Sequence, residues 1–122
     1  MLLTHHKVLN RWLHLGGHAD GESNILNVAL REAKEESGIN GIKPLNNQIF
    51  DVDVHPIPEY KKRSEPAHFH YDIRYILIAP ITEFSISDES DELKWFSIKE
   101  MKNYQWNESV GRMIRKWEKL LG

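Results

Sequence analysis

Residues 16–39 read GGHADGESNILNVALREAKEESGI, a glycine turn followed by a long run of polar and aliphatic residues. Residues 23–37 are rich in Ala, Leu, Glu and Lys and contain no Pro or Gly, so they predict a helix. Gly38 stands where helices commonly end in a left-handed residue, and Ile39 supplies the apolar contact that often follows. The segment is therefore expected to form a loop, a helix and a closing turn.

Three glutamates lie within this helix: Glu35 and Glu36 follow Glu32 by three and four residues. Residues at these spacings are neighbours on a helix surface, and here they continue an apolar face. Such a carboxylate cluster is costly unless a cation is bound. Hard oxygen donors suit Mg²⁺ or Mn²⁺, which take their other ligands from water and phosphate. The alternative is that these glutamates are solvated helix formers, with Arg31 paired to Glu35.

The rest of the chain predicts a mixture of strands and helices. Strands are expected at residues 2–6, 12–15, 67–79, 81–86 and 93–96, and residues 44–54 lead irregularly into another strand. Residues 55–66, with three prolines, and the acidic residues 88–92 predict loops. A capping box at Ser97 and Glu100 opens a short helix, and residues 107–121 form an amphipathic helix. This order predicts an α/β (α+β) fold around a mixed sheet.

The composition is that of an ordinary globular protein. A chain of 122 residues, 40% hydrophobic and 28% charged, predicts one domain spanning residues 1–122. The formal net charge of -2 offers no basic footprint, so no nucleic-acid partner is expected. The absence of cysteine excludes disulfides and thiolate zinc sites. No apolar run approaches the ~20 residues that span a bilayer. Residues 1–7 do not resemble a signal peptide, so we expect a cytoplasmic location without membrane association.

The glycine turn and the helix together resemble the Nudix box. The pattern of that family is Gly, five residues, Glu, seven residues, then Arg-Glu-aliphatic-x-Glu-Glu-x-Gly-aliphatic. The matching residues are Gly17, Arg31, Glu32, Ala33, Glu35, Glu36, Gly38 and Ile39. Ser23 stands where the pattern has its first Glu, and the neighbouring Glu22 is a candidate replacement for that carboxylate.

The resemblance implies a mixed sheet sandwiched between helices, with the box as loop, helix and loop. It also implies a metal site for Mg²⁺ or Mn²⁺ formed by Glu32, Glu35 and Glu36, with the backbone carbonyl of Gly17 as a further ligand. Arg31 would orient a glutamate. The implied chemistry is attack of water on the phosphoanhydride of a nucleoside diphosphate linked to another moiety.

The general base is left between two residues. Glu35 is the first choice within the box, since the family uses either a box glutamate or a carboxylate on a distant loop. Glu92, in the acidic segment, is the candidate outside the box. The alternative for that segment is a solvated acidic turn.

Several polar residues are candidates for substrate contact. His68 and His70 alternate on one strand face, where they could bind a base, a phosphate or a second metal; the alternative is a polar face under a loop. His14 and His18 flank the glycine turn. Tyr71 and Tyr75 are expected in the core. The candidate contacts are His18, Glu22, His68 and His70.

Three functional hypotheses follow. The first is a metal-dependent pyrophosphohydrolase with a small nucleotide substrate. The second is a catalytically weak or inactive Nudix-fold module that senses a nucleotide, motivated by Ser23. The third is a domain whose helix matches the box by accident, which predicts no divalent-metal binding.

The family normally has another strand before the segment that leads into the box, so we expect a sheet short of an N-terminal strand. An open sheet edge invites a partner strand, which motivates the hypothesis of a homodimer that completes the sheet. Gel filtration at low micromolar concentration is expected to show the dimer. A clean monomer at 14.3 kDa would contradict it.

Overall fold

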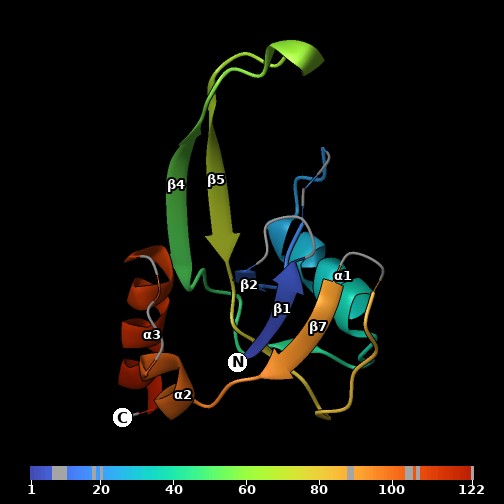
Figure 1. Ribbon diagram of the computed structural model, residues 1–122. Coiled ribbons are helices and arrows are strands. Elements are labelled where there is room, and N and C mark those ends of the chain that lie inside the picture. Colours follow the sequence, from blue (N-terminus) through green and yellow to red (C-terminus); the bar gives the residue numbers. More distant parts are fainter. Residues whose placement is uncertain are drawn as a thin grey trace.

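The fold combines short helices with three small antiparallel sheets (Figure 1). The computed structural model describes residues 1–6, 11–17, 19, 21–87, 90–103, 106 and 108–121. Its strands are β1 (Leu2–His6), β2 (Arg11–His14), β3 (Lys43–Pro44), β4 (Asp51–Ile57), β5 (His68–Arg74), β6 (Leu77–Ile78) and β7 (Ser90–Trp95). Its helices are α1 (Ile25–Ser37), the 3₁₀ turn η1 (Lys61–Arg63), α2 (Ile98–Lys102) and α3 (Glu108–Leu121). The α+β class predicted from the sequence is confirmed, and every strand pair within the described ranges is antiparallel. No helix in this part of the chain is long and apolar enough to cross a membrane.

The central sheet has the order β2-β1-β7, so β1 is paired on both edges. Its inward side carries Leu3, which is 2% exposed. Leu3 belongs to one core cluster with Phe96, which directly follows β7, Met101 of α2 and Ile114 of α3. The predicted capping box is present, with the Ser97 side chain and the Glu100 side chain each accepting a backbone N–H of the other residue. The last strand begins earlier than predicted and includes Glu92, opposite His5, so Glu92 is not in a loop.

The helix of the glycine-rich segment forms as predicted, two residues later. Asn24 is its cap, because its side-chain oxygen accepts the Asn27 N–H at 3.1 Å. Gly38 ends it at φ 70°, a left-handed conformation that favours glycine. Residues 81–86, predicted as a strand, do not join a ladder. Instead, the Ser85 N–H donates to the Ser37 carbonyl at 2.7 Å and satisfies the helix end.

Strands β4 and β5 form a long hairpin that projects beyond the central sheet, with η1 at its tip (Figure 1). The prediction that residues 55–66 are a loop is wrong for 55–57, which continue β4. Pro56 is tolerated there because a two-stranded ladder has open edges. The predicted strand over residues 67–79 is divided, since β5 ends at Arg74 and β6 pairs with β3 instead of β4.

The hairpin buries its polar face and exposes its apolar face. The side chains of Asp51 and Arg74, which are cross-strand partners, are 1% and 7% exposed. On the opposite face, Val54 and Tyr71 are 49% and 68% exposed. The expectation that Tyr71 lies in the core is therefore wrong, because the polar partners of the same strands point inward.

Asp51 pairs with one cationic side chain within the hairpin, Arg74, and with two from α3, Arg112 and Lys116. Its carboxylate accepts hydrogen bonds from Arg74 at 2.8 Å, from Arg112 at 2.7 and 2.8 Å, and from Lys116 at 2.6 Å. The hydrogen bond from Arg112, with those from Lys116 and Arg74, holds the pKa of Asp51 well below its usual range despite the opposing effect of burial. The carboxylate is therefore the anchor of the hairpin.

Asp51→Ala is expected to lower the free energy of unfolding by about 3–5 kcal/mol, because it removes the one carboxylate within hydrogen-bond distance of the buried Arg74 in the described structure. Urea unfolding measures this change. Asp91→Ala removes a carboxylate that is 51% exposed and pairs only with His5 in the described structure, and is expected to cost less than about 1 kcal/mol. Equal losses in the two variants would contradict the anchoring role.

The acid limb of the stability curve should also depend on Asp51. Its pKa is depressed in the folded state, so its contribution is present above the unfolded pKa of about 4 and is lost as the pH falls toward the folded value. Asp51→Asn is expected to reduce the slope of stability against pH below about pH 4. An unchanged slope would show that other carboxylates control acid unfolding.

Candidate functional site

A cavity of about 1080 Å³ lies between α1 and the polar face of the hairpin. The turn at Gly16 and Gly17 and strand β2 complete its wall. Its lining includes the acidic, imidazole and guanidinium side chains of His14, Glu32, Glu36, His55, His70, Asp72 and Arg74. The cavity therefore brings the helix of the glycine-rich segment to the strand on which paired histidines were predicted.

The glycine turn passes directly against the helix carboxylates. A Cβ atom placed on Gly17 would lie 2.5 Å from the Cδ atom of Glu32, closer than real Cβ contacts come. The Gly16 N–H donates to Oε2 of Glu36 at 3.2 Å. The close approach at position 17 thus favours glycine, and the turn lies against Glu32 and donates a hydrogen bond to Glu36, one helical turn farther on.

Glu32 and Glu36 fit a hard divalent cation. Both side chains are partly buried and line the cavity, and Glu32 is 19% exposed. Since Gly17 has no Cβ, its backbone lies directly beside the Glu32 carboxylate. Oxygen donors of this kind are the ones that Mg²⁺ and Mn²⁺ prefer.

Two other residues of the predicted box, Glu35 and Arg31, are exposed and do not line the cavity. The roles of Glu35 as metal ligand and general base therefore stay predictions. Arg31 approaches Glu32 with Nη2 3.6 Å from Oε1, a distance beyond a direct hydrogen bond. Its predicted orienting role rests on that ion pair.

The predicted substrate contacts are distributed unevenly. His70 lines the cavity, whereas His68 is exposed, with Nδ1 2.8 Å from the Pro66 carbonyl oxygen. Glu22 is exposed and accepts the Asn24 N–H at 2.9 Å. His18 lies outside the described residues, as do residues 88 and 89 of the acidic segment. Glu92, the base candidate from that segment, is exposed in β7 and does not line the cavity.

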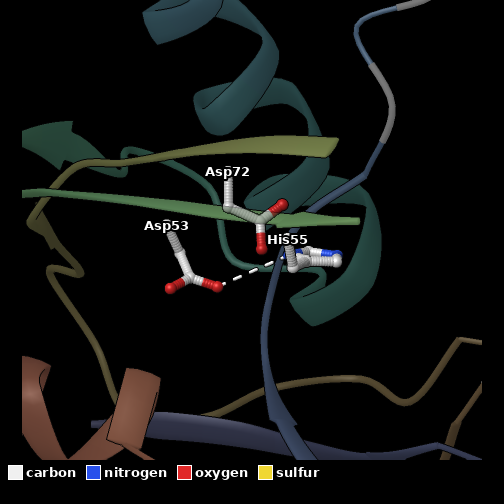
Figure 2. A group of neighbouring side chains, drawn as sticks. All are labelled: Asp53, His55 and Asp72. Atoms are coloured by element: carbon white, nitrogen blue, oxygen red, sulfur yellow. Dashed lines mark ion pairs between the residues drawn. The ribbon is translucent and has the colours of Figure 1, made fainter. Parts of the chain in front are cut away.

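Three functional candidates were missed in the sequence: Asp53, His55 and Asp72. They lie beside one another on the inward face of the hairpin (Figure 2). The alternation of polar residues at positions 51, 53 and 55 was the available signal, since it repeats with the period of a strand. It was hidden because residues 55–66 look like a proline-rich loop.

His14 adds a neutral imidazole to the cavity wall. Burial lowers its pKa, and the nearby charge of Arg74 acts in the same direction, while the carboxylates of Asp72, Asp53 and Asp51 oppose them. Neutral imidazoles can accept as well as donate hydrogen bonds, which suits contact with polar ligands.

Comparisons with known proteins agree with this geometry. The sequence model of the NUDIX domain matches residues 1–117. The "Probable DHNTP pyrophosphohydrolase" of Lactococcus lactis subsp. cremoris is 34% identical over 61 residues, which cover 50% of this chain and 36% of that relative. The chain thus matches about a third of that relative's length.

Two solved structures share the fold. A hydrolase of the NUDIX family from Clostridium perfringens has a TM-score of 0.73 at 23% identity, covering 98% of this chain and 88% of its own. A C. elegans Ap4A hydrolase in a binary complex has a TM-score of 0.66 at 22% identity, covering 98% and 84%.

Gly17→Ala is expected to lower the affinity for Mn²⁺ by about 10–100-fold, because the new methyl group displaces the Glu32 carboxylate. The fold should be little affected, since the clash is with the end of a flexible side chain. Mn²⁺ titration followed by electron paramagnetic resonance measures the affinity. Gly16→Ala is the matched control, because a Cβ there meets nothing within 4 Å. Equal affinities in the two variants would contradict the role of the close approach.

Proposed function

Because the chain belongs to the Nudix domain family, we propose that it is a metal-dependent pyrophosphohydrolase acting on a nucleoside diphosphate linked to another moiety. The observation that carries the proposal is the approach of the glycine turn to Glu32 and Glu36 at the cavity wall. The names of the pyrophosphohydrolase relative and of the Ap4A hydrolase with the same fold favour a nucleotide substrate.

In the proposed mechanism, Glu32 and Glu36 hold Mg²⁺ or Mn²⁺, with Glu35 and the carbonyl of Gly17 as further ligands. When bound, the cation supplies a water of lowered pKa and neutralises charge on the phosphoryl oxygens. The Gly16 N–H donates to Oε2 of Glu36 and restrains that carboxylate at the cavity wall. Arg31 restrains Glu32 through the ion pair between them.

Proton removal from the attacking water is assigned to Glu35, with Glu92 as the alternative. Both side chains lie outside the cavity wall, so either acts after a rearrangement on substrate binding. Such tightening between the free enzyme and the substrate complex is common for general bases. Glu35 is preferred because it is one residue from Glu36 on the same helix.

The wall opposite the glutamates would bind the remainder of the substrate. His14, His55 and His70 line it, and they offer hydrogen-bonding groups to phosphate or base. Of the predicted contacts, His70 is the one whose position in the described structure supports a direct role.

A nucleotide sensor is the second candidate function. Ser23 replaces the first glutamate of the box, and the adjacent Glu22 binds the backbone N–H of Asn24. Glu22 is thus engaged at the helix start, and its role as a replacement for the lost carboxylate stays a prediction. A protein that binds a nucleotide with a cation but hydrolyses it poorly would have this arrangement.

Release of phosphate or pyrophosphate from a panel of nucleotides, with and without Mg²⁺ or Mn²⁺, is the test. Glu36→Gln is expected to reduce metal-dependent kcat/KM by about a hundredfold or more, since loss of several kcal/mol of charge stabilisation corresponds to that factor. Glu83→Gln, at an exposed glutamate outside the cavity, is the matched control and should retain activity.

The outcomes separate the two functions. Release that is unaffected by Glu36→Gln would contradict the metal role of Glu36. Absence of release from every nucleotide, together with metal-dependent thermal stabilisation by one of them, would favour the sensor.

A further inference from the structure

The inward face of the hairpin carries a second group of metal-ligating side chains, Asp53, His55 and Asp72 (Figure 2). Each offers one ligand atom, and these atoms all lie within 4.8 Å of one another. Asp53 and Asp72 are direct cross-strand partners in the β4–β5 ladder, and His55 is two residues along the same face. We infer that these residues form a binding site for a transition-metal dication of the Zn²⁺ or Co²⁺ type.

The spacing of the donors suits such an ion. Nδ1 of His55 lies 3.4 Å from Oδ2 of Asp53. Two ligands bound at ~2.1 Å in a tetrahedral arrangement are separated by ~3.4 Å, so this pair already has the required distance. Asp72 needs a modest side-chain rotation, and its side chain, 38% exposed, is free to make it.

Neighbouring arginines leave oxygen atoms of both carboxylates available. Arg74 uses its short hydrogen bonds on Asp51 and Ser109, and reaches Asp53 at 4.0 Å and Asp72 at 3.7 Å. These separations are too long for direct hydrogen bonds. The bond from Arg112 to Asp53, at 3.2 Å, is made to Oδ1 and leaves Oδ2 facing His55.

The carboxylate of Asp53 carries the negative charge that a cation requires. Burial raises the pKa of Asp53, but the hydrogen bond from Arg112 and the charge of Arg74 outweigh it and lower the pKa overall. Asp53 is therefore ionised at neutral pH. Like charges placed directly opposite in a ladder are unfavourable, so the Asp53–Asp72 pair gains from a bound cation.

Imidazole chemistry distinguishes this site from the glutamate site on α1. Carboxylates and water suffice for Mg²⁺, whereas imidazole nitrogen favours Zn²⁺ and related ions. The ring centroids of His70 and His55 are 5.4 Å apart, so a further imidazole lies beside the three-residue group. His55 and Asp72 line the same cavity as Glu32 and Glu36, but the inferred site shares no ligand with the proposed catalytic metal and does not depend on the proposed hydrolysis.

Co²⁺ titration of the full chain followed by proton NMR tests the inference, because ring protons of a Co²⁺-bound histidine shift far outside their normal range. The titration uses the Glu32→Gln/Glu36→Gln variant, in which the glutamate site is disabled. Shifted signals from one imidazole are expected to persist in it and to disappear when His55→Asn is added. Asp72→Asn should weaken Co²⁺ binding by about tenfold or more.

His5→Asn is the matched control, because Nδ1 of His5 lies 3.3 Å from Asp91 without belonging to the three-residue group. This variant should keep the shifted signals and the Co²⁺ affinity. The inference is overturned if no imidazole signal shifts, if the shifted signals survive His55→Asn, or if they vanish with Glu32→Gln/Glu36→Gln alone. If one hairpin variant fails to fold, the other decides, since loss of Co²⁺ binding in folded Asp72→Asn supports the site and unchanged binding rejects it.

Discussion

The charge cluster at Asp51 determines which way the hairpin faces. Its carboxylate is held by Arg74, Arg112 and Lys116, and the first of these lies opposite it in the ladder. Strand side chains alternate with a period of two, so fixing one inward pair fixes every other position of both strands. The residues that consequently face inward are Asp53, His55, His70 and Asp72, and those that face solvent are Val52, Val54, Phe69 and Tyr71.

This orientation gives the cavity two walls of different chemistry. One wall carries Glu32 and Glu36, and the Gly16 N–H donates to Glu36. The other wall carries Asp72, imidazoles and the guanidinium of Arg74. A polyphosphate would meet several carboxylates and would be repelled unless cations accompanied it. The ion charge then dominates the local electrostatics, which is how metal sites accommodate anionic substrates. Metal dependence of the proposed reaction is thus a consequence of the wall composition.

Local patterns predicted the elements that local interactions control. The helix of residues 25–37 was predicted because its composition, its cap and Gly38 act within a few residues of one another. Which side of the hairpin turns inward could not be predicted in this way. That choice depends on the hydrogen bond from Arg112 to Asp51, and these residues are 61 positions apart in the chain. Apolar alternation placed Tyr71 in the core, but the long-range ion cluster decided otherwise. The contribution of Asp53 and Asp72 was missed because residues 55–66 look like a proline-rich loop, which hid the strand pairing that brings the two together.

An inward polar face and an outward apolar face are both unfavourable by ordinary rules. Burial of charges such as Asp51 and Arg74 gains little net stability even when they are well paired. Exposure of Val54 and Tyr71 forgoes the hydrophobic gain that the opposite register would provide. Departures of this kind are expected at functional sites, where local rules give way to chemistry. The proposed function accounts for this departure, because it assigns the polar face of the hairpin to the substrate-binding wall opposite the glutamate helix.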